Sequence, residues 1–158
     1  MDQQFLESLF HQHKLRFTKC RTDIIVFFFD ASFALSAKDL ETRLPQYDRV
    51  TIYRTLNSFI EKNIIHPIPS DGGAALYGLS EHIRKVLDQT TVSEDFTAAD
   101  QSSIEAIHEE HIHFTCNACG KTSCLPEQMI PKVSLPQGYQ VQEVEMVVKG
   151  YCKSCSHS

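Results

Sequence analysis

Residues 111–121 read HIHFTCNACGK, and a second cysteine pair, CKSC, follows at residues 152–155. Zinc binds four thiolates tetrahedrally at about 2.3 Å, and two C-x-x-C turns that meet in space supply this set of ligands. The two pairs are farther apart than in a compact zinc ribbon, so we expect intervening strands to bring them together. The pattern predicts a closed structural Zn²⁺ site that stabilises the fold and performs no reaction, formed by Cys116, Cys119, Cys152 and Cys155.

A thiol oxidoreductase that uses the C-x-x-C pairs is the alternative from another functional class. A thioredoxin-like motif normally lies at the N-terminus of a helix in a βαβ unit, however, and needs only one pair. Two further cysteines, Cys20 and Cys124, stand outside both pairs. We expect both to pack in a core, because unpaired cysteine behaves as a small apolar residue. For Cys124, a role as a ligand or as a redox-sensitive thiol stays open.

The histidines of the first stretch, His111 and His113, predict a second metal site. Residues two apart in a strand face the same side, so both imidazoles can reach one ion. Mixed sites of histidine and carboxylate suit Fe, Mn, Zn or Co. We therefore expect a regulatory divalent metal here, Fe²⁺ or another transition metal, whereas a pair of surface histidines is the simpler alternative. Further candidate ligands lie just upstream: Glu105, His108, Glu109 and Glu110.

The first half of the chain predicts short helices followed by a hairpin. Each predicted helix follows a residue that can cap it: Thr18, Ser36 and Asp48. The first predicted helix carries the apolar run 24–29, the second runs from Ser36 to about residue 44, and the third covers about 49–62. For the run 24–29, periodicity alone does not separate helix from strand. Residues 64–79 have the pattern of a hairpin. This order is typical of a winged helix-turn-helix.

The helix over about 49–62 also carries the candidate DNA contacts. Its apolar residues recur at helical spacing on one face, and Arg54 points the opposite way, with Tyr53 on a flank. Arginine reaches guanine O6 and N7 bidentately, and tyrosine contacts a thymine methyl group or a phosphate. The net charge of −5 lies entirely in residues 81–158, because basic and acidic residues are equal in number in residues 1–80. A basic cluster in that neutral half favours phosphate contacts over a merely solvated face: Lys14, Arg16, Lys19 and Arg21.

The second half predicts strands after a polar, acidic stretch. We expect a winged-helix domain over 1–79, a hinge and insertion over 80–110 with two short helices, and a zinc-binding domain over 111–158. Strands are expected at 111–116, 121–125 and 140–150. The whole is an α+β protein. We find no apolar run long enough to span a bilayer, no export signal and no catalytic constellation, and so expect a cytoplasmic protein that is not an enzyme.

Several motifs, in this order, resemble the ferric uptake regulator family. The sequence DRVTIYRTL at 48–56 is similar to that family's recognition helix, and Arg16-x-Thr18 with Arg21 is similar to its N-terminal DNA-contacting segment. The stretch 111–121 resembles its metal-binding signature, and the pair at 152–155 resembles its closing pair. The resemblance spans nearly the whole chain apart from the insertion.

The resemblance implies a homodimeric repressor with an N-terminal winged helix, a C-terminal α/β dimerisation domain and structural zinc in the four cysteines. A regulatory metal at the domain junction would close the two winged helices onto a palindromic operator in double-stranded DNA. Residues expected to contact DNA are Arg16, Thr18, Lys19, Arg21, Thr51, Tyr53 and Arg54. We expect an iron-responsive repressor of metal-uptake or related genes, with zinc, peroxide or haem as alternative signals and a protein-binding zinc module as a further alternative.

The sequence departs from the family pattern at the regulatory site. Ala34, Gly78 and Glu110 occupy positions where the family usually has metal ligands, and prolines interrupt the region of its long dimerisation helix. Of the regulatory site, the resemblance therefore carries over only His111 and His113. The remaining ligands are expected from His82 or from the candidates in the insertion.

Overall fold

The structure is a computed structural model that describes residues 3–69, 73–90, 111–126, 128, 130–132, 134–142 and 144–156, with the backbone alone at 87–90. The chain divides into two compact units, Met1–Val86 (unit 1) and Leu87–Ser158 (unit 2). Residues 91–110 of the hinge and insertion predicted over 80–110, with its second helix, lie outside the described residues. Among the described residues, none of the helices has both the length and the apolar character that crossing a bilayer requires.

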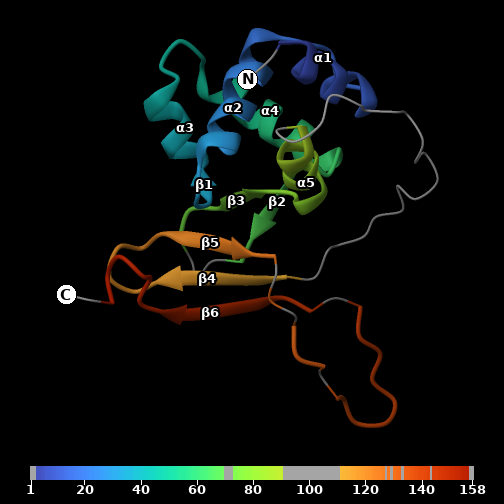
Figure 1. The fold of residues 1–158 in the computed structure, drawn as a ribbon, viewed down its shortest axis with the longest axis vertical. Helices are drawn as coiled ribbons and strands as arrows, with labels where there is room; N and C mark the ends of the chain where they lie inside the picture. The colour runs from blue at the N-terminus through green and yellow to red at the C-terminus, as the bar shows by residue number, and fades with distance from the viewer. Residues whose placement is uncertain are drawn as a thin grey trace. The chain divides into compact units, whose positions relative to one another are not determined.

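Unit 1 begins with helices that start where the sequence places their caps (Figure 1). The threonine hydroxyl of Thr18 caps α2 (Lys19–Asp30), so the apolar run 24–29 is helical. Ser36 caps α3 (Ala37–Arg43) as predicted and forms a capping box with Asp39, and Asp48 caps α4 (Arg49–Glu61). These three predictions are confirmed. The helix α1 (Gln3–Gln12), which the sequence analysis did not predict, precedes them.

The core of unit 1 forms where the apolar faces of these helices meet. The rings of Phe10 from α1 and Phe59 from α4 stack with centroids 6.0 Å apart, and neither side chain is exposed. Helix α1 thus exists because its buried leucines and Phe10 cover the other helices, since a ten-residue helix is marginal by itself. The other fully buried side chains of this core include Ile24, Ile25, Leu40, Ile52, Leu56 and Ile64.

The wing of unit 1 is a small antiparallel sheet of order β1-β3-β2. Its strands are β1 (Leu35–Ser36), β2 (Ile65–Ile68) and β3 (Leu76–Leu79). The pairing of Ile65 with Leu79 forms the predicted hairpin, whose tip at 70–72 lies outside the described residues. Helix α5 (Glu81–Thr90) follows, as predicted, and inserts the buried Ile83 into unit 1.

Unit 2 is built on a three-stranded sheet of order β5-β4-β6 (Figure 1). Its strands are β4 (Ile112–Cys116), β5 (Thr122–Leu125) and β6 (Met146–Gly150). β5 is antiparallel to β4, whereas β6 is parallel to it. The strand predicted over 140–150 starts only at Met146. Met146 pairs with Ile112, the first residue of β4, and among the described residues no partner strand extends farther.

Candidate metal centres and nucleic-acid interface

The parallel pairing of β4 and β6 brings the two cysteine pairs together. Cys116, the last residue of β4, is in register with Gly150, the last residue of β6. Since the two strands run in the same direction, the chain leaves both of them at the same end of the sheet. The amide of Asn117 donates to the carbonyl of Gly150 at 2.7 Å and joins the first turn to the end of β6. The distant second pair therefore begins, at Cys152, beside the first.

Each C-x-x-C segment is a tight turn closed by backbone hydrogen bonds. In the first, the amide of Gly120 donates to the carbonyl of Cys116 at 2.9 Å. Gly120 has φ +69°, in the left-handed region that glycine adopts without strain. In the second, the amide of Cys155 donates to the carbonyl of Cys152 at 2.8 Å. These turns direct all four thiols to one side.

The four sulfur atoms fit a single tetrahedral ion. The Sγ atoms of Cys116, Cys119, Cys152 and Cys155 all lie within 4.8 Å of one another, and those of Cys119 and Cys152 are 4.0 Å apart. A tetrahedron with metal–sulfur bonds of about 2.3 Å has sulfur atoms about 3.8 Å apart. The arrangement therefore fits Zn²⁺ with only small side-chain adjustments, and all four cysteines are free thiols rather than disulfides. The predicted four-cysteine group is confirmed.

The electrostatics of this group favour a divalent cation. Backbone amides, first that of Cys119 and then that of Cys152, lower the pKa of Cys116 to about 6, and the Cys152 amide lies 3.3 Å from the Cys116 sulfur. The neighbouring sulfurs, that of Cys152 first, raise the pKa of Cys155 to about 12 because its thiol proton is shared with them. A bound metal would supply the positive charge that favours the thiolate form of Cys155.

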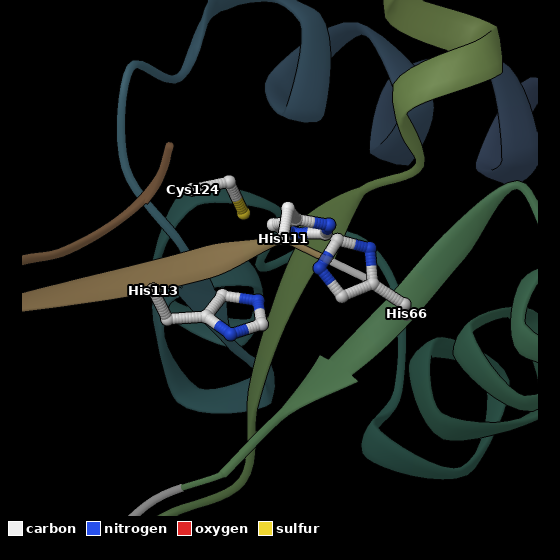
Figure 2. Close-up of side chains that lie close together, drawn as sticks. All are labelled: His66, His111, His113 and Cys124. Carbon is white, nitrogen blue, oxygen red and sulfur yellow. The ribbon is translucent and has the colours of Figure 1, made fainter. Parts of the chain in front are cut away.

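A second group of ligands lies on one face of the same sheet. His113 of β4 is directly opposite Cys124 of β5, and His111 lies two residues earlier, on the same side of the strand. Their ligand atoms lie within 4.8 Å of one another, and the two imidazole rings have centroids 4.6 Å apart. Figure 2 shows the Cys124 sulfur and the rings of His111 and His113 directed toward one another. Three donor atoms therefore converge within unit 2.

Burial keeps one of these imidazoles neutral. His113 is 7% exposed, and burial, with the neighbouring His111, lowers its pKa to about 4. A neutral imidazole keeps a lone pair for a metal, which a protonated ring lacks. The ligand role of the His-x-His pair stays a prediction, which this geometry permits.

The remaining predicted ligands of the second site divide into three cases. Glu105, His108, Glu109 and Glu110 lie outside the described residues, and His82 belongs to α5 of unit 1. Cys124, expected to pack in a core, is only half-buried and lies among the histidines. The β4–β5 register explains this placement. The Cys116 amide bonds the carbonyl of Lys121 across the turn, and counting outward from that pair places position 113 opposite 124.

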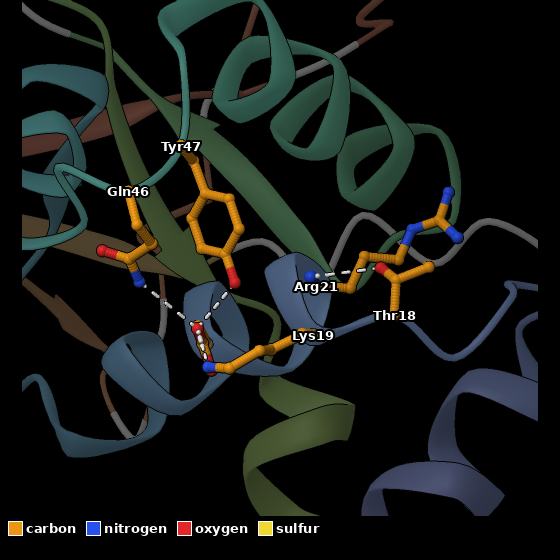
Figure 3. A network of polar contacts seen from close by, with 6 residues as sticks. Thr18, Lys19, Arg21, Gln46 and Tyr47 are labelled. Atoms are coloured by element: carbon orange, nitrogen blue, oxygen red, sulfur yellow. Dashed lines mark hydrogen bonds and ion pairs between the residues drawn. The ribbon is translucent and has the colours of Figure 1, made fainter.

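Thr18 and Lys19, predicted DNA-contacting residues at the start of α2, are exposed, but both also bond to other residues of the chain. Thr18 accepts a hydrogen bond from the amide of Arg21 at 3.4 Å, as a helix cap (Figure 3). Lys19 is 80% exposed, yet its ammonium group lies 2.8 Å from the carboxylate of Asp23, which raises the pKa of Lys19. The hydroxyl of Tyr47 donates to the same carboxylate at 2.8 Å. The basic cluster is therefore less positive than its sequence indicates.

Arg21 connects two elements of the winged helix. Its guanidinium donates to the carbonyl of Arg16 at 2.8 Å and to the hydroxyl of Ser58 on α4 at 3.4 Å. These contacts hold the beginning of α2 against α4. The Arg16 side chain, by contrast, is exposed, and only its backbone carbonyl takes part in these bonds.

The outer face of α4 carries an exposed arginine that has no bonding partner among the described residues, beside apolar groups. Arg54 is exposed and makes no hydrogen bond or ion pair with any described residue. Tyr53 is 37% exposed, with the guanidinium of Arg49 5.3 Å from its ring centroid, and Val50 is 57% exposed. Thr51 instead uses its hydroxyl on the cap, donating to Asp48 at 2.6 Å. The sequence analysis missed Arg49 and Val50, although each stands four residues before Tyr53 or Arg54, one helical turn away.

Comparison with known proteins supports this architecture. No family model matches the chain, and no curated protein matches it in sequence. Among solved structures, the ferric uptake regulator of Vibrio cholerae has a TM-score of 0.55 at 17% identity, covering 92% of this chain and 98% of that one. The ferric uptake regulator of Helicobacter pylori has a TM-score of 0.54 at 16% identity, covering 98% and 91%. A zinc uptake regulator in complex with zinc and DNA has a TM-score of 0.58 at 17% identity, covering 96% and 91%.

At these identities the comparison establishes the fold. The chain has the α+β fold of the ferric and zinc uptake regulators: an N-terminal winged helix followed by a small domain with a four-cysteine group suited to zinc. This is the fold that the motifs at 48–56, 111–121 and 152–155 predicted.

Proposed function

We propose that this protein is a metal-responsive, DNA-binding transcriptional regulator of the ferric uptake regulator family, acting as a repressor. The observation that carries the proposal is the outer face of α4, where Arg54 is exposed without a partner among the described residues, beside Val50 and Tyr53. An exposed arginine on the second helix of a helix-turn-helix has the geometry for reading guanine in the major groove. The solved structures of the same fold include one of a zinc uptake regulator bound to zinc and DNA.

We assign a separate function to each of three successive segments of the chain. Residues 1–79 bind DNA, residues 80–110 form the hinge, and residues 111–158 form the dimerisation domain with structural Zn²⁺ on the four cysteines. Arg16, Lys19 and Arg21 are proposed phosphate contacts, with Thr18 and Thr51 positioning their helices. A homodimer would place its two α4 helices in successive major grooves, about 34–36 Å apart, on a palindromic operator.

Regulation is proposed to act through the second metal group. A metal that binds one arrangement of the domains more tightly than the others shifts the population toward that arrangement by the difference in affinity. His111 and His113 are the proposed ligands, with Glu105, His108 and Glu110 as further candidates. The motif resemblance favours Fe²⁺ as the signal. The Cys124 thiol favours Zn²⁺, because thiolate is a soft ligand. We infer a cytoplasmic regulator rather than an enzyme.

Operator selection from random DNA, with zinc-replete protein and with or without added Fe²⁺, Mn²⁺ or Zn²⁺, tests the proposal. Fluorescence anisotropy on the selected site then compares two variants of one residue. Arg54→Ala should weaken binding by about 1–3 kcal/mol, whereas Arg54→Lys should keep affinity for any DNA but lose discrimination at the contacted base. Absence of affinity for all DNA, even at low salt, would instead favour a protein-binding zinc module.

The sensing step has its own test. A His111→Ala/His113→Ala variant should bind DNA like the metal-free parent and lose its response to the added ion. If the variant keeps the metal dependence of the parent, the second group is not the sensor, although the protein remains a DNA-binding regulator.

A further inference from the structure

The strand register, and not only the side-chain rotamer, places Cys124 beside the histidines. Its direct cross-strand partner on β4 is His113, and side chains directly opposite in an antiparallel pair have Cβ atoms about 4.5–5.5 Å apart. The hydrogen-bonded turn between Cys116 and Lys121 sets this register. A slip of one residue would move Cys124 to the other face of the sheet.

The same register separates Cys124 from the four-cysteine group. Cys124 is level with His113, three residues before Cys116 on β4. At about 3.3 Å per residue, this is about 10 Å along the strand, too far for Cys124 to share an ion with that group. The four cysteines are also complete without it. Its thiol therefore belongs with His111 and His113.

We propose that Cys124 is a ligand of the second metal site and makes that site selective for Zn²⁺ over Fe²⁺ and Mn²⁺. The proposal rests on the function proposed above and identifies the signal of the same site. Two imidazoles and one thiolate form a soft donor set, which zinc favours, whereas carboxylate and water oxygens suit Mn²⁺ and many Fe²⁺ sites. Three protein ligands with one further position are also a common arrangement for tetrahedral Zn²⁺.

Co²⁺ is the probe that reports the thiolate directly. Protein that retains one Zn²⁺ per chain in the four-cysteine group is titrated with Co²⁺. The parent should develop a near-ultraviolet sulfur-to-cobalt charge-transfer band together with the visible bands of tetrahedral cobalt. Cys124→Ser should lose the charge-transfer band. Cys20→Ser, which changes the second cysteine outside the two pairs, located in α2, should keep it.

Competition between metals tests the selectivity. Cys124→Asp keeps a ligating atom but exchanges sulfur for oxygen. The preference of this variant for Zn²⁺ over Mn²⁺ should fall by at least about tenfold. Mutation of a group that only hydrogen-bonds to a metal ligand already lowers metal affinity by about that factor, and Cys124→Asp changes a ligand itself.

A measurement on the parent alone covers the case in which a variant does not fold. A second equivalent of Zn²⁺ should protect Cys124 from alkylation, as read by mass spectrometry, while the reactivity of Cys20 stays unchanged. Co²⁺ bound without a sulfur band, or equal alkylation of Cys124 with and without the second Zn²⁺, overturns the role of Cys124. Such results would still allow a sensor that binds metal through the histidines alone. The proposed function itself is refuted if added metal does not change DNA binding by the parent protein.

Discussion

Removing the structural zinc should unfold unit 2 and leave the winged helix folded. The perturbation is Cys119→Ser/Cys155→Ser, which takes one thiolate from each turn. This pair is chosen because it preserves the buried Cys116 and the hydrogen bond that its sulfur receives from the Cys152 amide at 3.3 Å. The variant therefore removes metal ligands with little direct loss of packing.

The magnitude follows from where the apolar core lies. Of the 21 buried apolar side chains among the described residues, all but Cys116 belong to unit 1. Each fully buried large side chain contributes about 1.5–3 kcal/mol, so the described part of unit 2 gains little from this source. A structural zinc site contributes about 10–16 kcal/mol, as much as the whole stability of an ordinary domain, about 5–15 kcal/mol. Loss of the ion should thus exceed the stability of unit 2.

Hydrogen exchange read by mass spectrometry resolves the two units. Peptides of β4 and β6 should lose protection in the variant, whereas peptides of α2 and α4 should exchange as in the parent. Cys20→Ser is the matched control and should change neither. The reasoning fails if the variant is metal-free by elemental analysis and the amides of β4 and β6 remain as protected as in the parent.

Four further predictions concern unit 1. Phe59→Ala should destabilise the winged helix by about 3–5 kcal/mol in urea unfolding, because the ring is fully buried against other aromatic and aliphatic groups; a loss below about 1 kcal/mol would contradict that packing. Ser36→Ala should cost about 1 kcal/mol through loss of the capping box. The Ser36 hydrogen bonds hold the pKa of Asp39 below its ordinary 3.8. The Asp39 carboxylate therefore stabilises the fold above pH 3.8, and this stabilisation is lost as the pH falls through the lowered pKa. Asp39→Asn should flatten this acid dependence, measured by thermal unfolding against pH. Lys19→Gln should reduce the salt slope of DNA binding by about one, provided that Lys19 leaves Asp23 for a phosphate, and an unchanged slope would exclude that contact.

Interactions within a few residues were predictable from the sequence. Thr18, Ser36 and Asp48 cap the helices that they were expected to cap, because a capping side chain bonds an amide only two or three residues away. The C-x-x-C turns and the alternation that puts His111 and His113 on one face are equally local. Helix α1 was missed because its stability comes from packing against α4 rather than from a cap.

The amino-acid sequence by itself determined the local elements, the kinds of ligand and the winged-helix order, since each depends on neighbours along the chain. Only the tertiary structure decided which distant groups meet. The parallel pairing of β4 with β6 brings Cys116 and Cys152 together, and the β4–β5 register assigns Cys124 to the histidines. Likewise, only the folded unit shows that the Arg21 guanidinium also bonds the Ser58 hydroxyl on α4. Strand order and register depend on which segments exclude water from one another, and that is a property of the whole folded unit.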